Sequence, residues 1–103
     1  MRHKVLAVGL VAAICDTGVG HAADAMAGKQ KAALCVACHG VAGNSTNGLW
    51  PKLAGQHQMY LVKTLRDFRS GVRKDASMNA MAKSLSDADI ANLATYYASE
   101  RQK

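Results

Sequence analysis

Apolar residues repeat with the period of a helix over residues 57–70. Leu61, Leu65 and Phe68 stand at positions i, i+4 and i+7, while the opposite face of the stretch is polar. Gly71 follows, and glycine is the residue type that most often ends a helix. The pattern predicts an amphipathic helix over this range.

The C-terminal part of the chain carries the fullest set of helix signals. Ser86 is a favourable N-cap residue, and Asp87 and Asp89 follow it in the first turn, where the helix dipole favours acidic side chains. Arg101 comes near the end of the stretch. The apolar stripe consists of Ile90, Leu93, Ala94 and Tyr97. A final helix is therefore predicted after Ser86.

The rest of the pattern predicts one more helix and otherwise loops. Asp24 can cap a helix over about residues 25–34. Residues 40–48 are rich in glycine and asparagine, and residues 72–77 form a short polar segment. Strand signals are nearly absent. The sequence predicts an all-α fold of three main helices joined by loops, without a sheet.

A five-residue segment after the first predicted helix is the strongest indication of chemistry. Cys35, Cys38 and His39 form the pattern C-x-x-C-H, the attachment signature of c-type heme. Each cysteine can form a thioether bond to one edge of the porphyrin, and the histidine can reach the iron as its proximal ligand. A zinc site would need a second pair of ligands, and no cysteine follows position 38. A thioredoxin-like dithiol would need a strand-helix-strand context. The motif therefore predicts heme attachment.

The ligand on the other face of the iron determines what such a protein does. An open face permits gas binding or catalysis, whereas a methionine sulfur closes the site and raises the reduction potential. Met78 and Met81 both follow a polar loop and precede the final helix, and the residues alone leave the choice between them open. His57 is a third candidate, although a lone histidine at a helix start is more often a surface or capping residue.

The N-terminal residues have the pattern of a secretory signal peptide. A basic segment at positions 2–4 precedes an apolar run at 5–14, and small residues lead to Ala22 and Ala23. Cleavage is expected after one of these two alanines, with Ala25 as a further choice. An uncleaved segment that acts as an anchor is the alternative, although the apolar run is short for a bilayer.

Processing of this kind divides the chain into a signal peptide, residues 1–22, and a single domain, residues 23–103. The signal peptide holds Cys15, so the mature domain keeps only the two cysteines of the heme motif. The formal charge falls from +6 to +5, because the signal peptide holds two basic residues and one acidic residue. A domain of this size buries only about 60% of its unfolded surface. A bound heme would supply the apolar core that the chain lacks.

Seven segments of the mature chain match a known family in their order and spacing. They are residues 35–40, 51–56, 60–61, 68–73, 78–82, 85–90 and 93–97. In these segments the chain resembles the class I cytochromes c, in particular the bacterial cytochrome c-553 group and the single-heme halves of diheme bacterial cytochromes c. The resemblance implies a small class I cytochrome c fold, with three main helices and loops wrapped around one covalently bound heme c and its iron.

The resemblance also implies roles for individual residues. Cys35 and Cys38 would form the thioethers, and His39 would be the proximal axial ligand. Pro51 follows His39 by 12 residues and resembles the family proline whose carbonyl accepts a hydrogen bond from the proximal imidazole. Such a contact fixes the orientation and tautomer of the ring.

Two further roles follow from the family spacing. The distance to the Leu-Ser-Asp segment selects Met78 as the distal axial ligand and leaves Met81 as the second choice. Gly28 resembles a glycine of the first helix against which an aromatic residue of the last helix packs. Tyr96 is its partner by alignment, while the apolar stripe equally accepts Tyr97.

The family and the predicted export together imply a soluble carrier of single electrons in the periplasm of a Gram-negative bacterium. Its partners would be redox proteins of the respiratory chain, and the carrier itself would be a monomer without stable membrane insertion after cleavage. The sequence shows no acid–base pair and no nucleophile beside a histidine, so an electron-transfer protein is expected rather than an enzyme. The modest charge and the export argue against nucleic acid as a partner.

Two alternative functions remain. One is a heme enzyme or gas sensor with an open sixth coordination position, and the other is a heme subunit bound permanently to a larger oxidoreductase. An enzyme of the first kind would need a distal histidine or arginine. The basic residues that gather near the second predicted helix read as a solvated face or as neighbours of a heme propionate; they are Arg66, Arg69, Arg73 and Lys74.

Overall fold

Helices form the framework of the part of the chain that the structure describes. The structure is a computed structural model that describes Gly9 and residues 22–103. Its elements, in chain order, are α1 (Ala25–Lys31), η1 (Ala32–Leu34), α2 (Val36–His39), η2 (Val41–Gly43), α3 (Gln58–Ser70), α4 (Ala76–Ala82) and α5 (Asp87–Ser99), where η marks a 3₁₀-helix. No strand occurs in these residues, as predicted. The predicted signal peptide lies outside the described residues, apart from Gly9 and Ala22.

The three predicted helices correspond to α1 continued by η1, to α3 and to α5, but the helical content is larger than expected. The heme motif forms the short helix α2, and α4 begins at Ala76, within the segment 72–77 predicted as a polar loop, and continues to Ala82. The side chain of Asp75 caps α4 by accepting a hydrogen bond from the backbone N–H of Met78 at 2.9 Å. The Asn79 amide donates to the carbonyls of Phe68 and Arg73, both at 2.8 Å. The two Asn79 contacts hold α4 against the end of α3, and their acceptors lie 11 and 6 residues away in the sequence.

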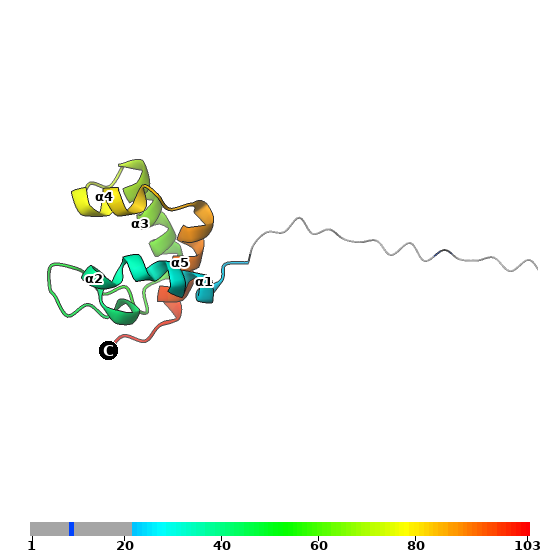
Figure 1. The fold of residues 1–103 in the computed structure, drawn as a ribbon, viewed down its shortest axis with the longest axis horizontal. Coiled ribbons are helices and arrows are strands. Elements are labelled where there is room, and N and C mark those ends of the chain that lie inside the picture. Colours follow the sequence, from blue (N-terminus) through cyan, green and yellow to red (C-terminus); the bar gives the residue numbers. More distant parts are fainter. Residues whose placement is uncertain (1–8, 10–21) are drawn as a thin grey trace, which may run out of the picture.

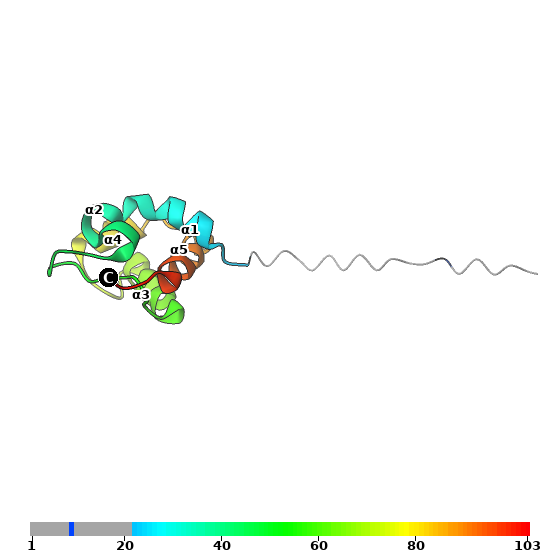
Figure 2. The same cartoon turned by 90° about the horizontal axis from the view of Figure 1, so that it is seen from below.

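The first and last helices, α1 and α5, cross closely (Figures 1 and 2). Gly28 lies at the crossing. A Cβ atom at this position would lie 2.0 Å from the carbonyl oxygen of Asn92 and 2.8 Å from Cβ of Tyr96. Only glycine therefore fits, because both neighbours belong to the rigid part of α5. The structure identifies Tyr96 as the partner of Gly28 among the two tyrosines that the sequence allowed.

Polar contacts at the start of both helices support the same crossing. The backbone N–H of Asp24, the N-cap of α1, donates to the side-chain oxygen of Asn92 at 2.8 Å. Lys31 at the end of α1 forms an ion pair with Asp89 at 3.5 Å. The helix α3 packs on the other side of α5, and the buried residues between them include Leu61 and Leu93. The core thus centres on α5.

Ser86 and Asp89 form a capping box at the start of α5. The Ser86 hydroxyl accepts from the Asp89 backbone N–H, and the Asp89 carboxylate accepts from the Ser86 backbone N–H, both at 3.0 Å. This second hydrogen bond is the main reason why the pKa of Asp89 lies below its ordinary value of 3.8. The carboxylate therefore stabilises the fold above about pH 4, and this contribution is lost as the pH falls through the lower, folded pKa.

Replacing Ser86 with alanine is expected to destabilise the protein by about 1 kcal/mol, because the Asp89 backbone N–H loses its capping acceptor. Denaturant unfolding of the heme-loaded protein at pH 7 measures the change. Ser84→Ala is the matched control, since Ser84 is an exposed serine two residues earlier. Equal unfolding midpoints for both variants would contradict the capping role.

Candidate heme-binding site

The short helix α2 brings the cysteines of the heme motif onto one face. Cys35 is the N-cap residue of α2, and the backbone N–H of His39 donates to its carbonyl at 2.9 Å. Residues three apart on a helix lie on neighbouring positions of its surface. Cys35 is half-buried and Cys38 is exposed, and both carry free thiols. The two sulfurs can therefore bond to the same edge of one planar group.

His39 is buried, and its ring is oriented by the backbone. Its Nδ1 lies 2.8 Å from the carbonyl oxygen of Pro51. A carbonyl can only accept, so Nδ1 carries the proton and Nε2 keeps a free electron pair for a metal ion. This is the hydrogen bond that the family resemblance implied for Pro51.

The loop that carries Pro51 is itself held in place. The backbone N–H groups of Leu53 and Ala54 donate to the carbonyl of Gly43 at 2.8 and 3.2 Å, and that of Gly55 donates to the carbonyl of Tyr97 at 2.9 Å. The loop is thus tied to η2 on one side and to α5 on the other. Because the Pro51 carbonyl has little freedom in the folded domain, it fixes the orientation of the imidazole there.

The two candidate methionines differ in their surroundings. Met78 is partly buried and packs against the hydrophobic core, whereas the side chain of Met81 is 41% exposed. Both belong to α4, which lies with α2 at the end of the molecule remote from the start of α1 in both views (Figures 1 and 2). His57 is exposed and precedes α3 without forming a side-chain cap. Burial therefore favours Met78 among the three candidates for the distal ligand.

These donors fit a covalently attached heme. One imidazole and one thioether cannot complete the coordination of an iron ion, so the remaining ligands must come from the cofactor, as the four nitrogens of a porphyrin do. Free thiols at Cys35 and Cys38 would supply the two attachment points, beside the histidine that would be the proximal ligand. The residues that would hold heme c are thus Cys35, Cys38, His39 and Met78.

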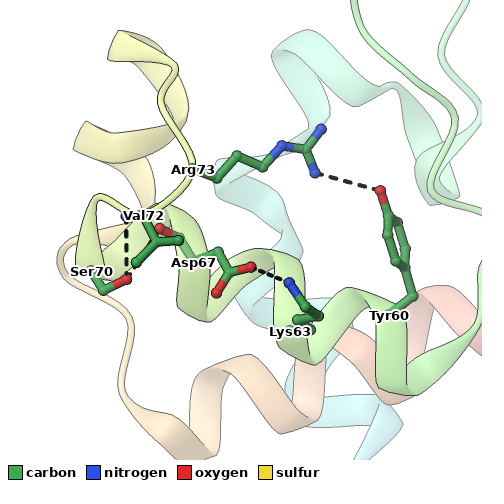
Figure 3. Close-up of polar contacts among 6 residues, drawn as sticks. All are labelled: Tyr60, Lys63, Asp67, Ser70, Val72 and Arg73. Atoms are coloured by element: carbon green, nitrogen blue, oxygen red, sulfur yellow. Dashed lines mark hydrogen bonds and ion pairs between the residues drawn. The ribbon is translucent and has the colours of Figure 1, made fainter.

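Part of the predicted basic cluster is engaged within the protein. Figure 3 shows Arg73 reaching from the segment after α3 back toward Tyr60, with 3.4 Å between its nitrogen and the tyrosine hydroxyl. The Arg73 guanidinium also lies 4.7 Å from the centre of the Phe68 ring. The hydrogen bond from Arg73 lowers the pKa of the exposed Tyr60. Lys63 pairs with Asp67 on the same helix, at 2.5 Å.

Arg69 points to a different part of the fold. Its guanidinium donates to the carboxylate of Asp87 at 2.6 Å and to the carbonyl of Leu85 at 3.1 Å. The pKa of Asp87 is lowered chiefly by this hydrogen bond. Arg69 therefore links the end of α3 to the start of α5. The cluster is accordingly not a uniform set of solvated cations.

Sequence reasoning missed the residues that position α4. Asp75 precedes Met78 by three residues, which is the spacing of an N-cap acceptor and its backbone donor. That spacing could have predicted the helix. The two carbonyl contacts of Asn79 have no comparable sequence signal, because their acceptors are 11 and 6 residues away.

Together the helices and the donor set define a small domain built to receive a covalently attached heme. Comparison with known proteins agrees: the family model described as "Cytochrome c" matches residues 25–99. Cytochrome c4 of Pseudomonas aeruginosa is 46% identical over 97 residues, which cover 93% of this chain and 48% of the relative. Cytochrome c-554(548) of Halomonas halodenitrificans is 45% identical over 82 residues, 77% of this chain and 99% of the relative.

A solved structure gives the same result for the fold. The crystal structure of reduced recombinant cytochrome c4 from Pseudomonas stutzeri superposes with a TM-score of 0.75 at 43% identity, over 80% of this chain and 48% of that one. The chain spans about half the length of the cytochrome c4 relatives that it matches.

The chain belongs to the cytochrome c family. Its fold is the all-α cytochrome c fold that the resemblance implied. Within the described residues, no helix is both long and apolar enough to cross a membrane.

Proposed function

We propose that this protein is a periplasmic carrier of single electrons with one covalently bound heme c. In this proposal residues 1–22 are a signal peptide and residues 23–103 form the mature domain. Cys35 and Cys38 hold the heme through thioether bonds. His39 and Met78 are the axial ligands of its iron, with Met81 as the second choice.

The hydrogen bond between His39 and Pro51 is the observation that carries the proposal. It keeps the proton on Nδ1 and so leaves Nε2 as a neutral donor of an electron pair. Heme iron, when bound, alternates between the ferrous and ferric states and so stores one electron. A second donor at Met78 would close the iron to other ligands, which suits electron transfer better than catalysis.

The surroundings of the heme motif support exchange of electrons at the surface. Cys38 is exposed, and the nearby apolar side chains of Val36 and Val41 are exposed as well, Val41 to 76%. A partner protein could therefore approach the attachment edge without any opening of the fold. We expect this partner to be another redox protein of the respiratory chain. A thiosulfate dehydrogenase electron acceptor of Thiomonas intermedia, 48% identical over 73 residues, suggests a dehydrogenase as one class of electron donor.

Expression of the full chain in a bacterium with heme c maturation tests the proposal. A periplasmic extract should give a reduced-minus-oxidised spectrum of c-type heme, with one heme per chain retained on a denaturing gel. The oxidised protein should show the weak near-infrared band of a methionine sulfur bound to iron. A heme that binds added ligands in place of methionine would instead support an enzyme or gas sensor.

Electron exchange with an acidic partner is expected to slow as ionic strength rises, because the mature domain carries a formal charge of +5 before the propionates are counted. Lys74→Glu should lower the association rate about fourfold at low salt. This estimate follows because reversing one charge about 10 Å from a partner charge in water is worth roughly 0.8 kcal/mol. Stopped-flow mixing with the partner measures the rate.

Lys29→Glu provides the control for this experiment, since Lys29 is an exposed lysine on α1 and the charge change is the same. The control should leave the rate close to that of the unmodified protein. Rates that do not vary with salt, or that fall equally in both variants, would show that docking does not use the basic cluster.

A further inference from the structure

Tyr97 is held in the centre of the fold by contacts on several sides. Its side chain is 3% exposed and belongs to the core cluster around α5. Gly43 approaches the ring so closely that a Cβ atom there would lie 2.7 Å from Cδ1 of Tyr97. The ring also packs against Tyr96 at 5.0 Å between centroids. The position of the hydroxyl is therefore fixed by the packing of the ring.

The Tyr97 hydroxyl is buried without a hydrogen-bond partner, and it is the single side-chain nitrogen or oxygen in this condition among the described residues. Burial of an unpaired hydroxyl is unfavourable, because the group gives up its hydrogen bonds to water. A phenylalanine would fill nearly the same volume without that penalty. An unpaired polar atom in such a position calls for a partner that the protein atoms alone do not supply.

Cys35 is the neighbour that can become this partner. Its side chain packs against the same core cluster. Burial raises the pKa of the Cys35 thiol, and the neighbouring Tyr97 hydroxyl acts in the opposite direction. Burial also raises the pKa of Tyr97, so its hydroxyl keeps its proton. The two side chains therefore share one buried cluster, in which the Cys35 sulfur is available to the unpaired hydroxyl.

Attachment of the heme changes what Cys35 can do. A free thiol is both a weak donor and a weak acceptor, whereas a thioether sulfur has no proton and can only accept. The Tyr97 hydroxyl is then the only possible donor of the pair. The direction of a hydrogen bond between the two groups is thereby fixed.

We propose that the Tyr97 hydroxyl donates a hydrogen bond to the Cys35 sulfur once that sulfur carries the heme, and so positions the first thioether link. The inference rests on the proposed attachment of heme at Cys35. Tyr97 is a positioning residue, because it would act on the heme through the sulfur. Cys38 is exposed, and no second buried, unpaired hydroxyl of this kind lies in the described residues to serve its sulfur.

The test compares Tyr97→Phe with Tyr96→Phe in the heme-loaded protein. In proton NMR spectra of the reduced state, Tyr97→Phe should shift the thioether methyl signal at Cys35 and leave that at Cys38 unchanged. The reduction potential should fall, because a donor that withdraws electron density from the sulfur is lost. The unfolding midpoint should fall as well. Tyr96→Phe should leave both methyl signals and the potential in place.

An unchanged Cys35 signal and potential in Tyr97→Phe, with equal or greater stability, would show that the hydroxyl is unpaired and would overturn the inference. Equal shifts at both thioethers would also overturn it, since they would report a general change in packing. The unmodified protein gives an independent readout, in which the hydroxyl proton should show a cross-peak to the thioether methyl at Cys35. Failure of that protein to retain heme on a denaturing gel would instead refute the proposed function.

Discussion

Cys35→Ala and Cys38→Ala are each expected to abolish the accumulation of stable heme-loaded protein. The thioethers are the proposed tether, and the cofactor would supply much of the core of a domain that is otherwise too small to bury enough apolar surface. The chain without heme should therefore be largely unfolded. Heme staining of denaturing gels and far-ultraviolet circular dichroism of the purified chains measure the two effects.

Cys15→Ser is the control for this pair, because Cys15 lies in the predicted signal peptide. It should give the same yield of heme protein as the unmodified chain. Native helix content in a chain without heme would contradict the view that the cofactor completes the core. Loss of heme in the Cys15 variant would contradict the assignment of attachment to Cys35 and Cys38 alone.

Met78→Ala is expected to yield a high-spin or water-ligated heme with a much lower reduction potential. The thioether ligand favours ferrous iron, and axial ligands tune heme potentials over a range of about 0.8 V. Met81→Ala, a change of the same size on the same helix, should keep both the near-infrared band and the potential. Visible spectroscopy and redox titration of the two variants provide the measurement.

Loss of the near-infrared band in Met81→Ala would change the assignment of the distal ligand. If Met81→Ala alone removes the band, the distal ligand is Met81, and α4 must rotate when the heme binds. The side chain of Met78, now packed against the core, would then be structural.

The predicted parts of the fold are those encoded by local signals. Both bounds of α3 were predicted within one residue, and the start of α5 was predicted at its N-cap, because capping and terminating residues act on their nearest neighbours. Gly71 ends α3 in the left-handed conformation, and Ser86 caps α5. The orientation of His39 was also foreseen, since Pro51 keeps a fixed spacing from it in the family. Local pattern and family spacing thus give most of the fold and the proximal side of the site.

The parts that were not predicted depend on contacts between distant residues. The helix α4 is held by Asn79, whose partners belong to α3 and to the following turn. The four basic residues seemed equivalent in the sequence, yet Arg69 pairs with Asp87 across 18 positions and Arg73 covers Phe68. No periodicity or composition reports which acceptor a long side chain reaches. The structure was needed to show that these basic residues have different partners.

The crossing of α1 and α5 has a consequence for how such a chain would mature during export. Gly28 contacts Asn92 and Tyr96, so in the proposed export the crossing would form only after the last helix has left the translocation channel. The heme motif, which precedes α5 by some fifty residues, would emerge earlier, while the chain is still open. An attachment enzyme would therefore meet both thiols before the fold can hide Cys35. We expect the late arrival of α5 and the absence of heme to act together, so that the chain stays unfolded until the cofactor is covalently attached.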